Sequence, residues 1–105
     1  MKLYTIARDK ELYDAKCQCN DGRVVVEKGS HINRNVNPLF AASKAVKNYL
    51  KDDSLFDANN NLTHNIEFSN LSAAASFVTG RIANGNIVWK TENGKAVKYS
   101  KQGGE

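Results

Sequence analysis

An Asp-Gly pair between two strand-like segments places the strongest constraint on how this chain folds. Asp21 and Gly22 stand between residues 12–19, where apolar and polar residues partly alternate, and residues 23–27, which contain three consecutive valines. Both positions of an Asp-Gly pair tolerate the positive φ angles that a tight hairpin turn requires. The sequence therefore predicts an antiparallel hairpin, and residues 3–7 predict a further strand.

A first helix is expected to start at Asn37 and Pro38. An asparagine side chain can accept a hydrogen bond from a first-turn amide, and proline at the first helical position removes no needed donor. We expect this helix to run to about Lys51, with one apolar stripe that packs and one cationic stripe. The cationic stripe consists of Lys44, Lys47 and Lys51.

The second half of the chain predicts a polar surface loop at residues 52–61 and a short strand at residues 65–68. Ser69 or Asn70 is expected to cap a second helix over residues 71–79.

Gly80 is expected to end that helix, because glycine adopts the left-handed conformation of a C-cap without strain. Strand-like residues 86–91 and 95–100 then flank an Asn93-Gly94 turn, which predicts a second hairpin.

Together these elements predict an α+β fold in which an antiparallel sheet with hairpins is covered by two helices. A chain of 105 residues has room for one core and not for a second. We expect a single domain over residues 1–100 and a flexible tail over residues 101–105.

Charge and hydropathy narrow the class of protein. Fifteen Lys and Arg against eleven Asp and Glu give a formal net charge of +4, which permits an anionic partner and argues against a mimic of DNA. Charged residues interrupt the first segment before a signal peptide forms, and no run of about 18 apolar residues predicts a membrane span. A cytoplasmic protein without membrane contact is expected.

Catalytic and metal-binding motifs are weak. Cys17 and Cys19, even with the two histidines, lack the paired ligand spacing of a zinc site, and Ser30 lacks the Gly-x-Ser-x-Gly elbow of a nucleophile. Glu27 and Lys28 are adjacent, so in a strand they are expected to face opposite sides, unlike the converging groups of a metal-dependent nuclease. We predict no catalytic residue, no metal, no cofactor and no enzymatic activity.

The segment from Phe68 to Lys90 carries the candidate binding residues. Its helix start, loop and strand offer groups suited to a phosphate and a base. These are Ser72, Arg81, Asn84 and Lys90. Plainer roles remain open, namely a turn requirement for Asn84 and a core position for Trp89.

The same segment resembles the bacterial family catalogued as domain of unknown function 4357. The matching motifs are Ala73-Ala74-Ala75, Gly80-Arg81, Ala83-Asn84-Gly85, Trp89-Lys90 and Gly94-Lys95. Upstream, the Asp14-Ala15-Lys16 and Asp21-Gly22 segments extend the resemblance over nearly all of residues 14–100. Leu71 stands where the family usually has proline, and Asn86 stands where it has a tryptophan, which removes one aromatic platform for stacking on a base.

The resemblance implies an accessory domain, of the kind appended to GIY-YIG nuclease-like or restriction-modification proteins. Independently of the resemblance, the basic residues clustered beside a loop and a helix start predict a non-catalytic module that binds DNA. Arg81, Lys90 and the cationic stripe are its expected phosphate contacts, and Ser72 and Asn84 are further candidate contacts. The alternative is a protein-interaction module or small regulator, such as one encoded by a mobile element, that docks on a nuclease or methylase.

Overall fold

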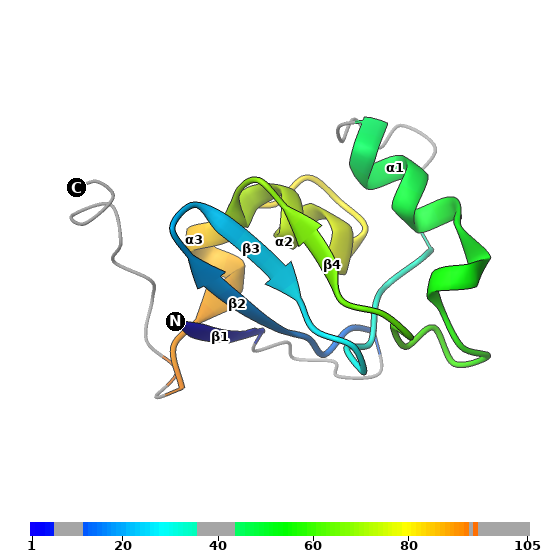
Figure 1. Ribbon diagram of the computed structural model, residues 1–105, viewed down its shortest axis with the longest axis horizontal. Helices are drawn as coiled ribbons and strands as arrows, with labels where there is room; N and C mark the ends of the chain where they lie inside the picture. The colour runs from blue at the N-terminus through cyan, green and yellow to red at the C-terminus, as the bar shows by residue number, and fades with distance from the viewer. Residues whose placement is uncertain (6–11, 36–43, 93, 95–105) are drawn as a thin grey trace.

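The computed structural model describes residues 1–5, 12–35, 44–92 and 94 (Figure 1). The elements follow one another as β1 (Lys2–Thr5), β2 (Lys16–Asn20), β3 (Arg23–Val26), α1 (Lys44–Lys51), η1 (Asp53–Leu55), β4 (Ile66–Phe68), α2 (Leu71–Thr79), α3 (Gly85–Val88) and β5 (Trp89–Lys90).

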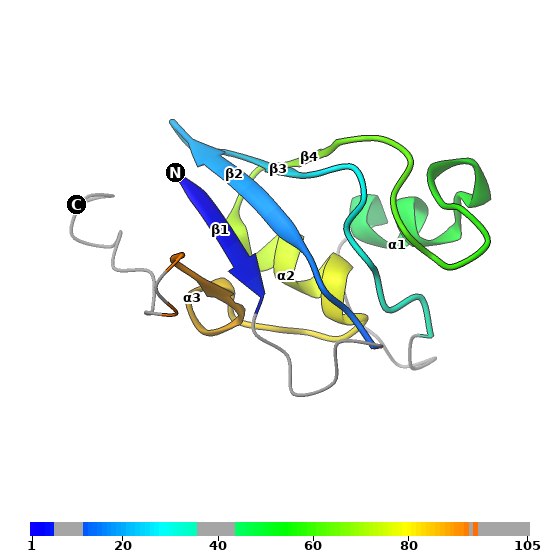
Figure 2. The same ribbon diagram turned by 90° about the horizontal axis from the view of Figure 1, so that it is seen from below.

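The strands form one sheet in the order β4-β3-β2-β1-β5, and every neighbouring pair is antiparallel. The hairpin between β2 and β3 turns at Asp21 and Gly22, with φ angles of 50° and 80°, as the sequence predicts. β1 lies between β2 and β5, so the first and the last described strands are neighbours (Figure 2). The α+β prediction is confirmed.

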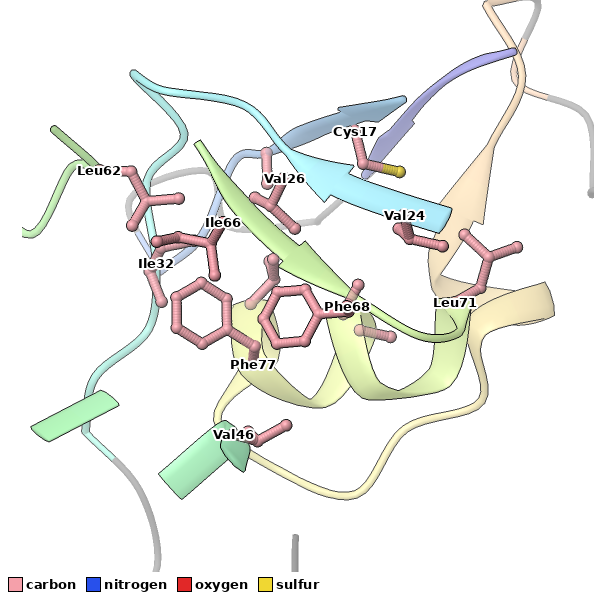
Figure 3. Packing of buried hydrophobic residues seen from close by; sticks show 14 of the residues in the cluster. Cys17, Val24, Val26, Ile32, Val46, Leu62, Ile66, Phe68, Leu71 and Phe77 are labelled. Carbon is pink, nitrogen blue, oxygen red and sulfur yellow. The ribbon is translucent and has the colours of Figure 1, made fainter. Parts of the chain in front are cut away.

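The core lies between one face of the sheet and α2. Alternate strand residues are buried there, including Leu3, Cys17 and Val24. Figure 3 shows Phe68 of β4 beside Phe77 of α2, and their ring centroids lie 5.1 Å apart. The alanines of α2 let its backbone approach this layer closely.

α2 begins and ends where the sequence predicts. The Asn70 side chain accepts a hydrogen bond from the Ala73 amide at 2.7 Å, which caps the first turn. Gly80 then ends the helix in the left-handed conformation, with a φ of 73°.

α1 packs through Val46 and Leu50, and Arg34 holds its C-terminal end. The Arg34 guanidinium donates two hydrogen bonds to the Leu50 carbonyl oxygen and pairs with Asp53 at 2.7 Å. The predicted helix start at Asn37 and Pro38 lies outside the described residues.

Two predictions about irregular segments need correction. Residues 52–61 are not wholly a surface loop, because they contain η1 and the buried Phe56. The first part of the strand predicted over residues 86–91 is wrong, since Gly85–Val88 is the helical turn α3 and strand geometry begins at Trp89. The Ile87 and Val88 amides both donate to the Asn84 carbonyl oxygen, which winds this segment into a helix despite its β-branched residues.

The second hairpin is described in part. Gly94 has a φ of 78°, and its amide donates to the Thr91 carbonyl oxygen, which forms a turn at the predicted place. The strand predicted over residues 95–100 and the tail at 101–105 lie outside the described residues.

Candidate nucleic-acid interface

The face of the sheet opposite the core carries polar side chains. Successive strand residues point to opposite faces, so Tyr4 points away from the core that holds Leu3. Trp89 is fully buried on the core side, which directs the next residue, Lys90, to the outer face. The outer-face residues of the strands are Lys2, Tyr4, Lys16, Gln18, Asn20, Arg23, Val25, Glu67 and Lys90, and Glu27 follows directly after β3. All are exposed or half-buried.

Strand register places an aromatic ring between two cations on this face. Tyr4 lies directly opposite Lys16 on β2 and directly opposite Lys90 on β5. Side chains opposite each other in antiparallel strands have Cβ atoms about 4.5–5.5 Å apart and interact directly. We call Lys90, Tyr4 and Lys16 the tyrosine row.

Ion pairs neutralise other charges on the outer face. Lys2 lies 3.4 Å from Glu27, whose carboxylate also accepts a hydrogen bond from Gln18, and Arg23 lies 3.7 Å from Glu67. Within the described ranges, neither Lys16 nor Lys90 forms an ion pair. Lys16 and Lys90, on either side of Tyr4, therefore lie outside the ion pairs of this face.

An open polar hollow adjoins the tyrosine row at Lys16. It is lined by Asp14, Lys16, Glu27, Lys28, Gly29 and Ser30. Glu27 and Lys28 both line it and lie beyond the end of β3 at Val26, where the chain turns at Gly29 with a φ of 92°. Among the residues that the structure describes, no group of three or more His, Cys, Asp and Glu side chains is placed to hold a metal ion.

The start of α2 is occupied by protein groups. The Gly85 amide donates to the Ser72 hydroxyl at 3.1 Å, and the Trp89 indole N–H donates to the Leu71 carbonyl oxygen at the same distance. The backbone of Gly85 packs so closely on Leu71 and Ser72 that a Cβ there would meet backbone atoms at 2.5–2.7 Å. The Ser72 hydroxyl expected to contact an anion is thus used to hold α3 on α2, and the Ala73 amide is taken by the Asn70 cap.

The remaining predicted contacts do not share one surface with Lys90. Arg81 is exposed just beyond the C-terminal end of α2, whereas α3, which precedes Lys90, packs on the start of α2. α1 lies at the other end of the molecule from α3 and β5 in both views (Figures 1 and 2). Its lysines are exposed at positions 44 and 51 and half-buried at position 47.

The sequence interpretation missed Tyr4 and Lys16. Alternation around Leu3 indicates that Tyr4 faces away from the core, but the partners of β1 follow from long-range pairing that no local pattern shows. The sequence leaves open whether Trp89 lies in the core or on the contact surface, and the structure shows that it lies in the core.

None of the helices in the described ranges is both long and apolar enough to span a bilayer. Searches of curated proteins and of solved structures found no match to the chain. A family model covers residues 5–101, which is nearly the whole chain and includes every element of the sheet apart from the first residues of β1. The chain therefore belongs to the family described as Domain of unknown function (DUF4357).

Proposed function

We propose that this domain binds nucleic acid, without catalysing a reaction, through the outer face of its sheet. The observation that carries the proposal is the tyrosine row, in which Lys16 and Lys90 flank an aromatic ring and have no ion-pair partner among the described residues. The net charge of +4 supports the same class of partner.

The two lysines are suited to contact the phosphates of a nucleic acid. Contacts to the phosphate backbone supply most non-specific affinity for nucleic acids, because each neutralised phosphate releases condensed counterions. Such contacts position a protein on its ligand and carry no sequence information by themselves. A weak, salt-sensitive interaction with little sequence preference is therefore expected from these lysines alone.

The test is a fluorescence anisotropy titration with labelled duplex DNA and with a labelled single strand, at low and at moderate salt. Reversing the charge of both lysines, in the double variant Lys16→Glu and Lys90→Glu, is expected to abolish binding at either salt concentration. The wild-type affinity is expected to fall steeply as salt rises.

The matched control is the double variant Lys44→Glu and Lys51→Glu, which changes the net charge equally on α1, at the opposite end of the molecule from β5. It is expected to weaken binding less, through the long-range field alone. Arg81→Glu tests the loop beyond α2 in the same way, and circular dichroism checks that each variant is folded. Failure of the wild type to bind below about 100 µM at low salt would exclude the function. A larger loss of affinity in the α1 variant than in the Lys16, Lys90 variant would exclude the outer face of the sheet as the binding surface.

A specific observation also favours the alternative, a protein-interaction module. Ile82 and Ile87 are 63% and 66% exposed, on either side of Asn84 in the segment that joins α2 to the end of α3. Contiguous exposed apolar patches mark protein contact sites, and these two isoleucines are the side chains from which we propose that such a patch is built. A nuclease or a methylase is the proposed partner.

Affinity purification from the native host separates the two candidates. A stoichiometric protein that survives nuclease treatment and is lost from the variant Ile82→Ser, Ile87→Ser supports the alternative. Recovery of nucleic acid alone counts against it.

A further inference from the structure

We infer that the ligand of the outer face is single-stranded nucleic acid, with one unpaired base stacked on the ring of Tyr4. This inference rests on the proposed function and names the class of nucleic acid that the surface accepts.

The width of the sheet is the first argument against a duplex. Strands in a sheet are about 4.8 Å apart, so five strands present a face roughly 19 Å across. The major groove of DNA is about 12 Å wide and admits a helix or a two-stranded ribbon. Tyr4 lies on β1, which has β5 on one side and the other strands on the other side. The five-stranded face is therefore wider than the groove, whereas a single strand can lie across the face and over Tyr4.

The kind of group at the centre of the row is the second argument. A duplex offers its phosphates and the edges of its bases, because both faces of each base are covered by stacking. A tyrosine ring stacks through its face. This stacking adds most binding energy when the face of the base is not already covered by a neighbouring base. The strand register places Lys16 and Lys90 on either side of the half-buried Tyr4. A lysine can lay its aliphatic stem along an apolar ring and keep its ammonium group in water, where it is available to the phosphates of a strand stacked on that ring.

Binding of matched probes by the wild-type protein is the primary test. The probes are a labelled thymidine oligomer of about 12 nucleotides, a uridine oligomer of the same length and a duplex of the same length, at one fixed salt concentration. We expect the single strands to bind tighter than the duplex. The two oligomers distinguish single-stranded DNA from single-stranded RNA.

Variants of Tyr4 then test the ring. Tyr4→Leu keeps an apolar side chain of similar bulk on the strand but removes the aromatic face. It is expected to weaken single-strand binding about 5- to 150-fold and to leave duplex binding unchanged. Tyr4→Phe keeps the ring and is expected to bind like the wild type, which separates a loss of stacking from a loss of structure.

The salt dependence of binding distinguishes direct contacts with the ligand from a purely structural role of Tyr4 or of the two lysines. Tyr4→Leu is expected to keep the wild-type slope of log affinity against log salt, because it removes no charge. The double variant Lys16→Gln, Lys90→Gln is expected to reduce that slope by about 1.4, at about 0.7 for each phosphate contact with a single strand.

The outcomes distinguish the two proposals. If no probe binds, the proposed function fails. If the duplex binds as tightly as the single strands and Tyr4→Leu has no effect on either, the proposed function stands and the single-strand inference is overturned.

Discussion

At the scale of single residues, Trp89 is an anchor of the core and not a stacking platform. It is 0% exposed, and its indole N–H is paired with the Leu71 carbonyl oxygen at 3.1 Å. Its place one residue before Lys90 also fixes which way that lysine points. A core residue thus orients a member of the tyrosine row.

Replacing Trp89 by alanine is expected to reduce the free energy of unfolding by about 3–5 kcal/mol, because a large buried volume is lost. Trp89→Phe retains most of the volume and loses the hydrogen bond, so a smaller loss is expected. Urea unfolding followed by circular dichroism measures both variants. An unchanged unfolding midpoint in Trp89→Ala would contradict the buried position.

Cys17 makes the free energy of unfolding depend on pH in the alkaline range. Burial raises the pKa of its thiol from 9.0 to about 12, with smaller contributions from Cys19 and Glu27. Between pH 9 and about pH 12 the Cys17 thiol therefore stays protonated in the folded chain and is deprotonated in the unfolded chain. The resulting stabilisation is complete below pH 9 and is lost as the pH rises towards 12.

We expect the wild type to lose about 1 kcal/mol more stability than Cys17→Ala between neutral pH and about pH 10. Urea unfolding at the two pH values, under reducing conditions, gives this difference. Parallel loss in the two proteins would show that the Cys17 thiol is not the group responsible.

At the scale of elements, the two segments that follow β4 show what local sequence can predict. α2 is predictable at both ends, because Asn70 caps it and Gly80 ends it through interactions within a few residues. α3 is not predictable, since Ile87 and Val88 favour a strand. Its helical turn depends on Gly85 lying against Leu71 and Ser72, which are distant in sequence.

The contact at Gly85 predicts an unusual cost for a small substitution. In Gly85→Ala the new Cβ would lie 2.5 Å from the Leu71 carbonyl carbon, and backbone atoms cannot rotate away as a side chain can. We expect a loss of about 3 kcal/mol, at the upper end for overpacking.

Gly22→Ala is the matched control, because Gly22 has a φ of +80° but no atom within 4 Å of an added Cβ. Its cost is expected to be about 1 kcal/mol, from backbone strain alone. Thermal unfolding compares the two variants. Equal losses would show that α3 moves away from α2 without penalty.

At the scale of the whole molecule, the sequence predicts the sheet better than it predicts the site. The Asp21-Gly22 turn and the cap of α2 are local, so the fold class and most element positions follow from them. Basic residues that look related along the chain, such as Arg81 and Lys90, adjoin different ends of α2, because Arg81 follows its last residue and α3, which precedes Lys90, packs on its start. Tyr4 and Lys16 meet Lys90 through pairing of distant strands, which no local pattern encodes.

The pairing of β1 with β5 also bears on how the chain is made. During synthesis at about 5–20 residues per second, β1 and the β2–β3 hairpin leave the ribosome long before β5. Until Trp89 and Lys90 emerge, one edge of β1 has no partner, and open edges of this kind invite pairing with other chains. The surface proposed to bind nucleic acid is therefore completed late in synthesis. A chain released before Lys90 keeps the unpaired edge of β1, which can pair with other chains, and lacks a complete tyrosine row.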